Sequence, residues 1–409
     1  MDKIRVEKLK RNVPLFYIFT FLSKTGFWVP ILYFFLTETK GFDSVTTLFL
    51  ISVAALSTSV FEIPTGVIAD KVSRKVSMTI GTLIRAICMF LLVPVGGFFP
   101  ILIVMIFRGV GTSFTSGAED SILYDSLKEI NKESRYKKEL NKTKTYHFLQ
   151  SGAAMLLSGI LSSVSLALPI ILSGISYLLA SFVSLSMLEP RKFDSEEGPL
   201  QEGYLKHAKS SLRLIFSSKG FSRGLTLLIF ATAIMEAVLL SNKNIIPPVL
   251  SELGVGAHFV AVALSFIYFM KAIGAYIASK FNNEGGELKE IYIGLGIYAI
   301  SMVALVLFRN PIVATICLAV VISIDPFIIS NLYKMVNDRV SSYRRATVIS
   351  IQSLMTEVLE TAYLPVFGLI LARVNLTASV AYIIAILGVI LLLLMINVRI
   401  GRISKKFSE

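Results

Sequence analysis

The sequence predicts an all-helical integral membrane protein in which twelve membrane-spanning helices form two six-helix bundles. The first observation is composition, because 54% of the residues are hydrophobic and only 16% are charged. The second is that the apolar residues fall in runs of about 18 to 26, a length that crosses a bilayer at about 1.5 Å per residue. The third is that basic residues gather in every second connection between these runs. A soluble globular protein does not combine these features.

Each apolar run gives one predicted helix, and a polar connection separates it from the next. In the first half of the chain the predicted spans are 13–36, 45–69, 76–95, 100–125, 146–167 and 170–188. In the second half they are 223–246, 258–280, 290–308, 311–333, 346–371 and 378–398. Both cysteines, Cys88 and Cys317, fall inside spans, which argues against a disulfide framework.

Basic residues are placed as expected for a protein whose N-terminus lies in the cytoplasm. On this assignment 32 of the 40 Lys and Arg residues lie in the two tails and the cytoplasmic connections, four on the outer side and four within spans. Cytoplasmic loops retain Lys and Arg, so the net charge of +13 needs no nucleic-acid partner. We expect a multi-pass protein of the inner (plasma) membrane with both termini cytoplasmic, whose basic segment 128–144 contacts lipid headgroups.

A basic turn joins the second and third spans. Its charged and small residues are Gly66, Asp70, Lys71, Arg74 and Lys75. In order and spacing they resemble the loop between the second and third helices of major facilitator superfamily transporters, although Ser73 stands where that family usually has Gly. The resemblance implies that these five residues form a latch that closes the inner gate without touching substrate.

A polar stretch divides the twelve spans equally. We expect an N-terminal six-helix bundle at 1–190, a cytoplasmic linker at 191–222 and a C-terminal six-helix bundle at 223–409. This layout agrees with the superfamily fold, and the resemblance implies that substrate binds near the midplane between two halves that rock about it.

Charged residues inside the spans are the strongest functional signal, because a charge at the bilayer centre costs at least about 2.5 kcal/mol. The four basic residues are Lys24, Arg85, Arg108 and Lys271, and the seven acidic residues are Glu62, Glu119, Asp120, Glu236, Asp325, Glu357 and Glu360. Four positive and seven negative charges leave −3 if all are ionised. A cavity with surplus carboxylates holds protons or attracts a cation, and either suits a proton-linked carrier.

Proton coupling is predicted for Glu62, Arg108, Glu119 and Asp120. Glu62 lies about 12 Å from the inner end of its helix, at a depth similar to Glu119 and Asp120, so facing carboxylates can share a proton. Arg108 lies on the same helix face as Glu119, about 16 Å away. The run 108–111 also resembles the fourth-helix Arg motif of the superfamily.

The substrate cavity is predicted to contain Glu236, Asp325, Glu357 and Glu360. Glu357 and Glu360 are three residues apart and therefore share one face of the eleventh helix. Their carboxylates would offset the charge of a cationic substrate.

Structural roles compete with these functional ones. Arg108 could belong to a structural ion pair, and Glu62, two residues before Pro64, could bond backbone freed by that proline. Asp325, directly before Pro326, could cap a broken helix. The other three basic residues of the spans could be counter-ions.

By resemblance to small bacterial members of the superfamily, the most favoured function is proton-coupled export of a drug-like or amphiphilic metabolite by alternating access. No nucleophilic triad, metal-ligand spacing or phosphate-binding loop indicates an enzyme, and the proton gradient replaces a cofactor. The fifth span lacks the Gly-Pro element associated with drug antiporters, so uptake of a polar solute stays open. A transport-dead receptor or scaffold is a third possibility, which the seven intramembrane carboxylates disfavour. We expect a monomer whose partners are a small-molecule substrate and membrane lipid.

Overall fold

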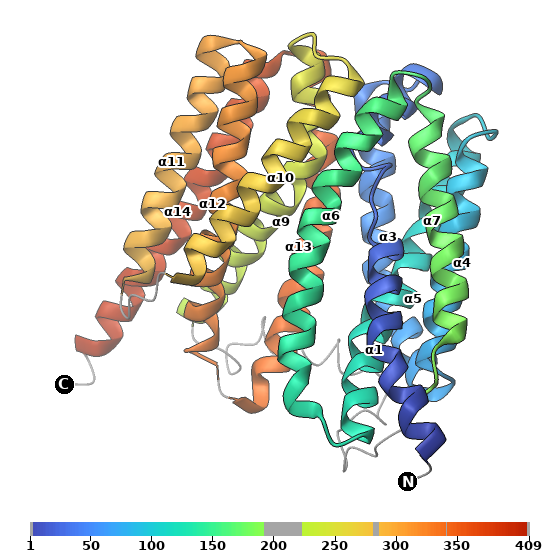
Figure 1. Cartoon of the computed structure of the whole chain (residues 1–409). Coiled ribbons are helices and arrows are strands. Elements are labelled where there is room, and N and C mark those ends of the chain that lie inside the picture. The colour runs from blue at the N-terminus through green and yellow to red at the C-terminus, as the bar shows by residue number, and fades with distance from the viewer. Residues whose placement is uncertain (1–2, 192–222, 281–285, 341, 407–409) are drawn as a thin grey trace. The chain divides into compact units, whose positions relative to one another are not determined.

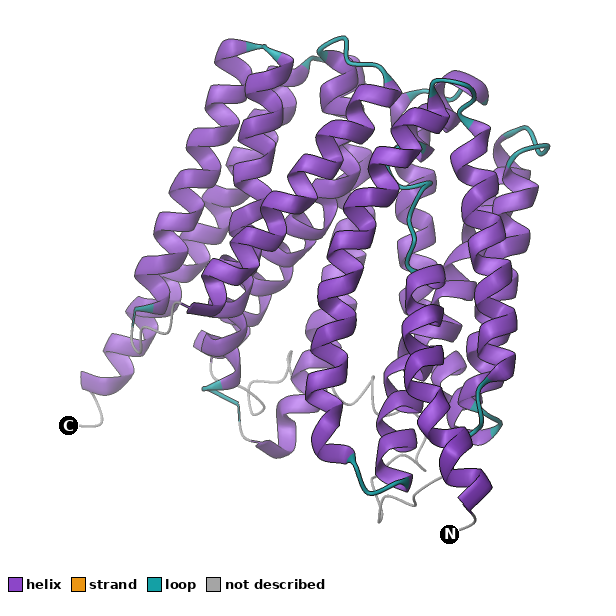
Figure 2. Ribbon diagram, in the orientation of Figure 1, coloured by secondary structure: helices purple, strands orange, loops and turns teal. Residues whose placement is uncertain are grey.

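The computed structural model describes residues 3–191, 223–280, 286–340 and 342–406, and every secondary-structure element in these ranges is helical (Figure 2). Their contacts divide the chain into two compact units. The first unit is Met1–Glu197 with Gly256–Ser265, and the second is Gly198–Val255 with Phe266–Glu409.

The first unit contains seven α-helices and two short helical turns of the N-terminal half, together with residues 256–265 (Figure 1). Its elements are α1 (Lys3–Ser23), α2 (Leu32–Phe34), a π-helical turn η1 (Phe35–Thr39), α3 (Ser44–Lys71), α4 (Arg74–Leu92), α5 (Phe98–Glu129), a 3-10 turn η2 (Glu133–Arg135), α6 (Tyr136–Ser162) and α7 (Ala167–Ser186).

The C-terminal half contributes six long helices. They are α9 (Arg223–Glu252), α10 (Ala257–Lys280), α11 (Glu287–Phe308), α12 (Pro311–Asn337), α13 (Ser342–Arg373) and α14 (Leu376–Lys406).

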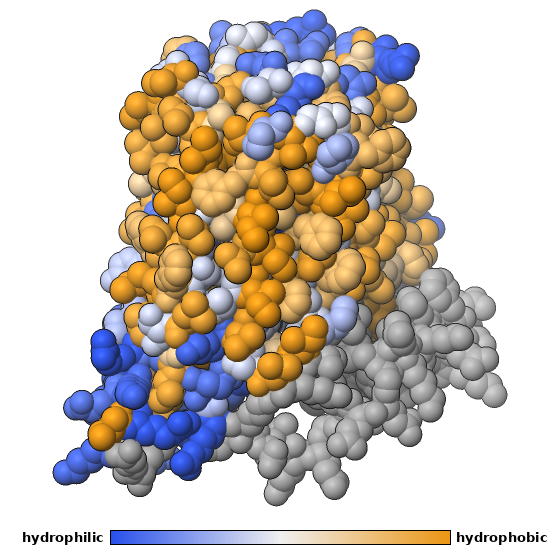
Figure 3. Space-filling model, turned by 90° about the vertical axis from the view of Figure 1, so that its right-hand side faces the viewer, coloured by the Kyte–Doolittle hydropathy of each residue, from blue (hydrophilic) through white to orange (hydrophobic). Residues whose placement is uncertain are grey.

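Ten of the described helices are long and apolar enough to cross a membrane. The other two predicted spans, 13–36 and 146–167, fall on the segment from α1 to η1 and on α6, whose apolar part is Leu149–Ser162. One face of the molecule shows a broad band of apolar side chains between polar ends (Figure 3). Exposed Leu and Phe side chains, such as Leu83 on α4 and Phe182 on α7, belong to a surface that suits lipid contact.

The prediction of one continuous helix over residues 13–36 is wrong. α1 ends at Ser23, and regular helix returns only at Leu32. Pro30 lies between them and has no N–H to donate, and a proline also disfavours helical backbone at the residue before it. The chain turns there instead, with the Leu32 N–H donating to the Trp28 carbonyl at 2.8 Å.

Small residues bring the membrane helices into close contact. Lipid is as apolar as a leucine side chain, so helices in a bilayer associate through tight packing more than through the hydrophobic effect. A side chain at Gly109 of α5 would overlap the Ala54 carbonyl of α3, and one at Gly81 of α4 would lie 2.6 Å from the Gly111 carbonyl of α5. Gly109 and Gly111 of α5 therefore allow close packing against α3 and α4.

Gly274 makes the corresponding contact in the second unit, where a Cβ atom would overlap the backbone of Ser323 on α12. We expect Gly274→Ala to lower stability by about 1–3 kcal/mol, because α10 and α12 must move apart. The matched control is Gly296→Ala on α11, where a Cβ atom meets nothing within 4 Å. Thermal unfolding in detergent compares the two, and equal midpoints would contradict the packing argument.

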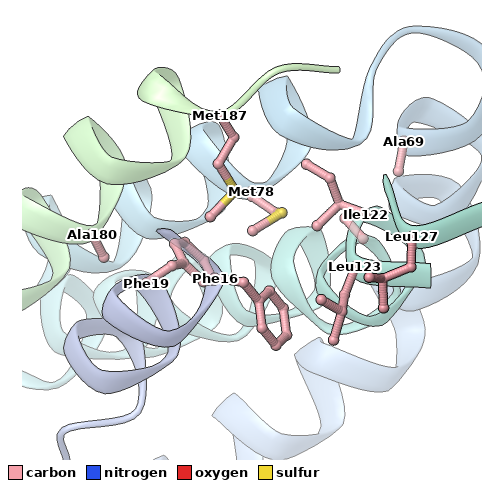
Figure 4. Close-up of a cluster of buried hydrophobic side chains, with 10 residues drawn as sticks. Phe16, Phe19, Ala69, Met78, Ile122, Leu123, Leu127, Ala180 and Met187 are labelled. Carbon is pink, nitrogen blue, oxygen red and sulfur yellow. The ribbon is translucent and has the colours of Figure 1, made fainter. Parts of the chain in front are cut away.

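Apolar side chains from five segments form a cluster in the first unit (Figure 4). Phe16 and Phe19 of α1 and Met78 of α4 meet Ile122 and Leu123 of α5, and all five are buried. At the opposite end of α4, the Lys40 ammonium donates to the carbonyls of Val93 and Val95 at 2.6 and 2.7 Å. A cation at a helix C-terminus is favoured by the helix dipole, so Lys40 fixes this end of α4.

Candidate functional site

The break in the first span is the centre of a polar site in the first unit. A backbone carbonyl freed inside a membrane needs another hydrogen-bond donor. The Ser23 carbonyl accepts from Arg85 Nη2 of α4 at 3.0 Å, and the Phe27 carbonyl accepts from Ser158 Oγ of α6 at 2.5 Å. Gln150 of α6 donates to the Phe21 carbonyl. Side chains of neighbouring helices thus hold the break in place.

Lys24 is the first residue after α1, and its ammonium lies 2.7 Å from Glu119 Oε1 of α5. Glu119 is buried, whereas the Lys24 side chain is 38% exposed. A charge-assisted contact of this length is strong, particularly where water is scarce. The structure thus identifies Lys24 as the partner of Glu119. The sequence indicated only that Lys24 could be a counter-ion, without naming the acid.

The structure does not pair Glu62 with Glu119, the contact between carboxylates that the sequence predicted. Glu62 is exposed, and Ser116 Oγ of α5 donates to its Oε1 at the long distance of 3.4 Å. The carboxylate that the structure pairs with Lys24 is that of Glu119. The Asp120 side chain lies outside the described residues.

Two arginines lie over aromatic rings near the break. The guanidinium carbon of Arg85 is 3.9 Å from the Tyr177 ring centroid, and that of Arg108 is 4.4 Å from the Trp28 ring centroid. The rings themselves are linked, because Trp28 Nε1 donates to the Tyr177 hydroxyl at 2.8 Å. A cation–π contact contributes about 0.5–2 kcal/mol. Within the described part of the chain neither arginine forms an ion pair with a carboxylate, so the predicted structural ion pair of Arg108 is not present there.

A pocket of about 270 Å³ lies beside the break, between α1 and α6. Its lining includes Tyr17, Phe21, Tyr146, His147 and Gln150. Most of this lining is apolar or aromatic, and Gln150 connects it to the backbone of the break. The pocket can therefore hold an apolar group.

Asp325 is a buried carboxylate of the second unit. It lies on α12, and Asn242 of α9 donates to its Oδ1 at 3.4 Å. Lys271 of α10 is the nearby cation, with its ammonium 3.8 Å from Oδ2. Among the described residues Oδ2 has no hydrogen-bond donor. The carboxylate is thus only loosely paired.

The other three predicted cavity acids differ in their surroundings. Glu236 of α9 accepts hydrogen bonds from Tyr333 at 2.7 Å, Thr356 at 3.0 Å and Gln352 at 3.3 Å. This network ties α9 to α12 and α13, which is a structural role that the sequence did not suggest. Glu357 and Glu360 both lie on α13, the first partly buried and the second buried.

The predicted latch is anchored by an acid that sequence reasoning missed. Glu189 follows α7, and its carboxylate accepts from the backbone N–H groups of Arg74 and Lys75 at 2.9 Å each and from Ser73 Oγ at 2.7 Å. A carboxylate at a helix N-terminus is stabilised by free N–H groups and by the helix dipole. Ser73 also caps α4 by accepting from the Val76 N–H at 3.2 Å, which explains why Ser replaces the usual Gly.

The remaining latch residues have separate placements. The Arg74 side chain pairs with Asp125 of α5, so it fastens α4 to α5. Gly66 lies within α3, and a Cβ atom added to it would meet no heavy atom within 4 Å. The side chains of Asp70 and Lys71 lie outside the described residues.

A second acid–base group fastens the same end of the unit. Glu129 at the end of α5 accepts from Arg5 Nε of α1 at 2.5 Å and from the Arg191 N–H at 2.6 Å. On α6, hydrogen bonds from Tyr17 and Arg135 lower the pKa of Glu139 below its ordinary value. The acids of these contacts stay ionised near neutral pH and hold α1, α5 and α6 together.

Comparisons with known proteins agree with this architecture. The family model for the Major Facilitator Superfamily matches residues 13–358. A crystal structure of a point mutant of the nucleoside transporter NupG superposes with a TM-score of 0.81 at 15% identity, covering 95% of this chain and 99% of that chain.

Two further solved structures have the same fold. A point mutant of the peptide transporter POT in complex with sulfate gives a TM-score of 0.73 at 14% identity, covering 96% of this chain and 94% of that chain. A bacterial homologue of the human lysosomal transporter Spinster, inward-facing and unoccupied, gives 0.67 at 15% identity, covering 97% and 96%. No curated protein sequence matches the chain.

Proposed function

The chain belongs to the Major Facilitator Superfamily of secondary transporters, and from this premise we propose that it exports an amphiphilic small molecule in exchange for protons by alternating access. The observation that supports the proposal is a buried carboxylate beside a lysine in each unit. Lys24 lies 2.7 Å from Glu119, and Lys271 lies 3.8 Å from Asp325.

The two carboxylates occupy similar positions. Glu119 lies on α5 and Asp325 on α12, the fourth predicted span of each half. Ten residues follow Glu119 to the end of α5 and twelve follow Asp325 to the end of α12, so both acids lie about 15–18 Å from that end. Both acids lie inside predicted membrane spans, where a carboxylate persists when it has a partner or a function.

The pairs provide a mechanism for coupling. While Glu119 is ionised, attraction holds Lys24 and the chain break against α5. A proton on Glu119 removes this attraction, so the break can take a second arrangement. A difference of about 1.4 kcal/mol between two conformations changes their ratio tenfold, and one strong ion pair supplies this amount. The expected coupling role of Glu119 is thereby retained, with Lys24 added as its partner.

The apolar pocket between α1 and α6 supports an amphiphilic substrate, because apolar and aromatic side chains line it and Lys24, paired with Glu119, directly follows α1. Glu357 and Glu360 remain our proposed cavity acids in the second half. The basic turn after α3 remains the proposed latch, fastened by the Arg74–Asp125 pair. We place the protein in the plasma membrane as a monomer with both termini in the cytoplasm.

Proteoliposomes that contain a pH-sensitive dye test both the activity and its direction. An amphiphile gradient is expected to drive protons in the opposite direction, which is antiport. Proton movement in the same direction as the solute would indicate uptake by symport instead. A set of amphiphiles and polar solutes is tested in this way, with a known transporter as the control. If none of them moves protons through this protein while the control transporter does move protons, a receptor or scaffold is favoured.

A further inference from the structure

The two arginines near the break carry positive charge that the described residues do not neutralise. Arg85 of α4 contacts the Tyr177 ring and one carbonyl, that of Ser23. Arg108 of α5 contacts the Trp28 ring, and its Nε has no hydrogen-bond partner among the described residues. Among the acids on the same helix as Arg108, Glu119 is paired with Lys24, Asp125 with Arg74 and Glu129 with Arg5.

Aromatic rings alone do not offset the partial burial of two guanidinium groups. The two cations are also neighbours, because each lies over one of two rings that are hydrogen bonded to each other. A buried charge persists in a protein when a group of opposite charge or several hydrogen bonds compensate it. The described contacts of the two arginines are two aromatic ring faces and one carbonyl. None of these groups carries a negative charge, so the pair of cations can accept an anionic partner.

We propose that Arg85 and Arg108 form a subsite for the anionic group of the substrate, so that the transported amphiphile is an organic anion. This inference rests on the proposed function and names its substrate class. A planar guanidinium matches a carboxylate, phosphate or sulfonate, with paired N–H donors directed at two oxygens. Both arginines and Trp28 are only partly buried, so a ligand group can reach them.

The aromatic side chains define the rest of the ligand. Trp28 and Tyr177 are hydrogen bonded to each other, and each covers one guanidinium. A planar apolar group next to the anionic group can pack against these rings while the anion meets the arginines. The subsite therefore favours an aromatic or similarly flat acid over a small inorganic anion.

Trp28 is the only tryptophan of the chain, so its fluorescence reports on this subsite alone. Purified full-length protein is titrated with benzoate and benzenesulfonate, and with benzylamine and benzyl alcohol as cationic and neutral controls, at constant ionic strength. We expect saturable changes in Trp28 emission with the two anions. Equal responses to all four probes would overturn the subsite.

Variants locate the response. Arg108→Gln and Arg85→Gln are each expected to weaken benzoate binding at least tenfold, and Arg108→Lys is expected to weaken it less because the charge is kept. Arg309→Gln is the matched control, because Arg309 is exposed and bonds Thr377 in the second unit. If Arg108→Gln does not fold, the benzoate affinities of Arg108→Lys and Arg85→Gln test the proposal instead. Unchanged benzoate affinity in the folded variants would refute the proposal.

The outcome is separable from that of the transport proposal. Proton movement driven by a cationic or neutral amphiphile, with no anion response at Trp28, would overturn the anion subsite and leave transport intact. Anion binding at Trp28 without any proton movement would support the subsite and contradict proton coupling.

Discussion

Glu119→Gln is expected to abolish accumulation driven by a pH gradient, while downhill exchange of substrate stays largely intact. Gln has the shape and hydrogen-bonding capacity of the protonated acid, so the variant imitates one state of the cycle and cannot reach the other. It also removes the partner that lies 2.7 Å from the Lys24 ammonium. Uphill transport and exchange in proteoliposomes measure the two effects, and we expect at least a tenfold loss in the first.

Two further variants show whether the effect belongs to the ion pair. Glu62→Gln is the matched control, since Glu62 is exposed and has only a long contact with Ser116. It is expected to keep most of the uphill activity. Lys24→Gln combined with Glu119→Gln should restore thermal stability without restoring coupling, because no uncompensated charge is left. Uphill transport by Glu119→Gln at the parent rate would assign coupling elsewhere.

Asp325→Asn is expected to have the largest effect in the second unit. The substitution keeps the side-chain volume but leaves the ammonium of Lys271, whose side chain is 33% exposed, without its carboxylate. Leaving a partly buried charged group without its partner costs about 1–3 kcal/mol. The variant should unfold at lower temperature and lose the pH dependence of transport. Thermal unfolding in detergent and transport rates across a pH series measure these changes.

Asp338→Asn is the control for this prediction, because Asp338 is exposed at the end of the same helix. Adding Lys271→Met to Asp325→Asn should recover stability, since the charge left alone by the single change is then removed. If Asp325→Asn keeps both the parent stability and the parent pH profile, the loose pair has no role in coupling.

The fold was largely predictable because a bilayer imposes a simple rule on sequence. Long apolar runs separated by charged connections predict membrane helices, and the described helices lie where these runs lie. The first span shows the limit of that rule. Gly26 and Pro30 are hidden in an apolar run, and hydropathy does not register the turn that Pro30 produces.

The candidate site was harder to predict, because its partners are far apart in sequence. Charge inside a span identified Glu119 and Asp325 as important, since burial makes such residues rare. Their lysine partners depend on how helices pack, which no local pattern reports. Glu189 was missed for the same reason, because it caps a helix that begins 115 residues earlier.

The interrupted first span also bears on how the chain enters the membrane during synthesis. α1 is not among the ten described helices that are long and apolar enough to cross a membrane, and Lys24 follows it directly. The donors for its exposed carbonyls lie on α4 and α6, which the ribosome makes later. Each unsatisfied carbonyl in lipid costs several kcal/mol. We therefore expect α3 to be the first segment to integrate stably, while α1 waits at the membrane surface until α6 has been translated.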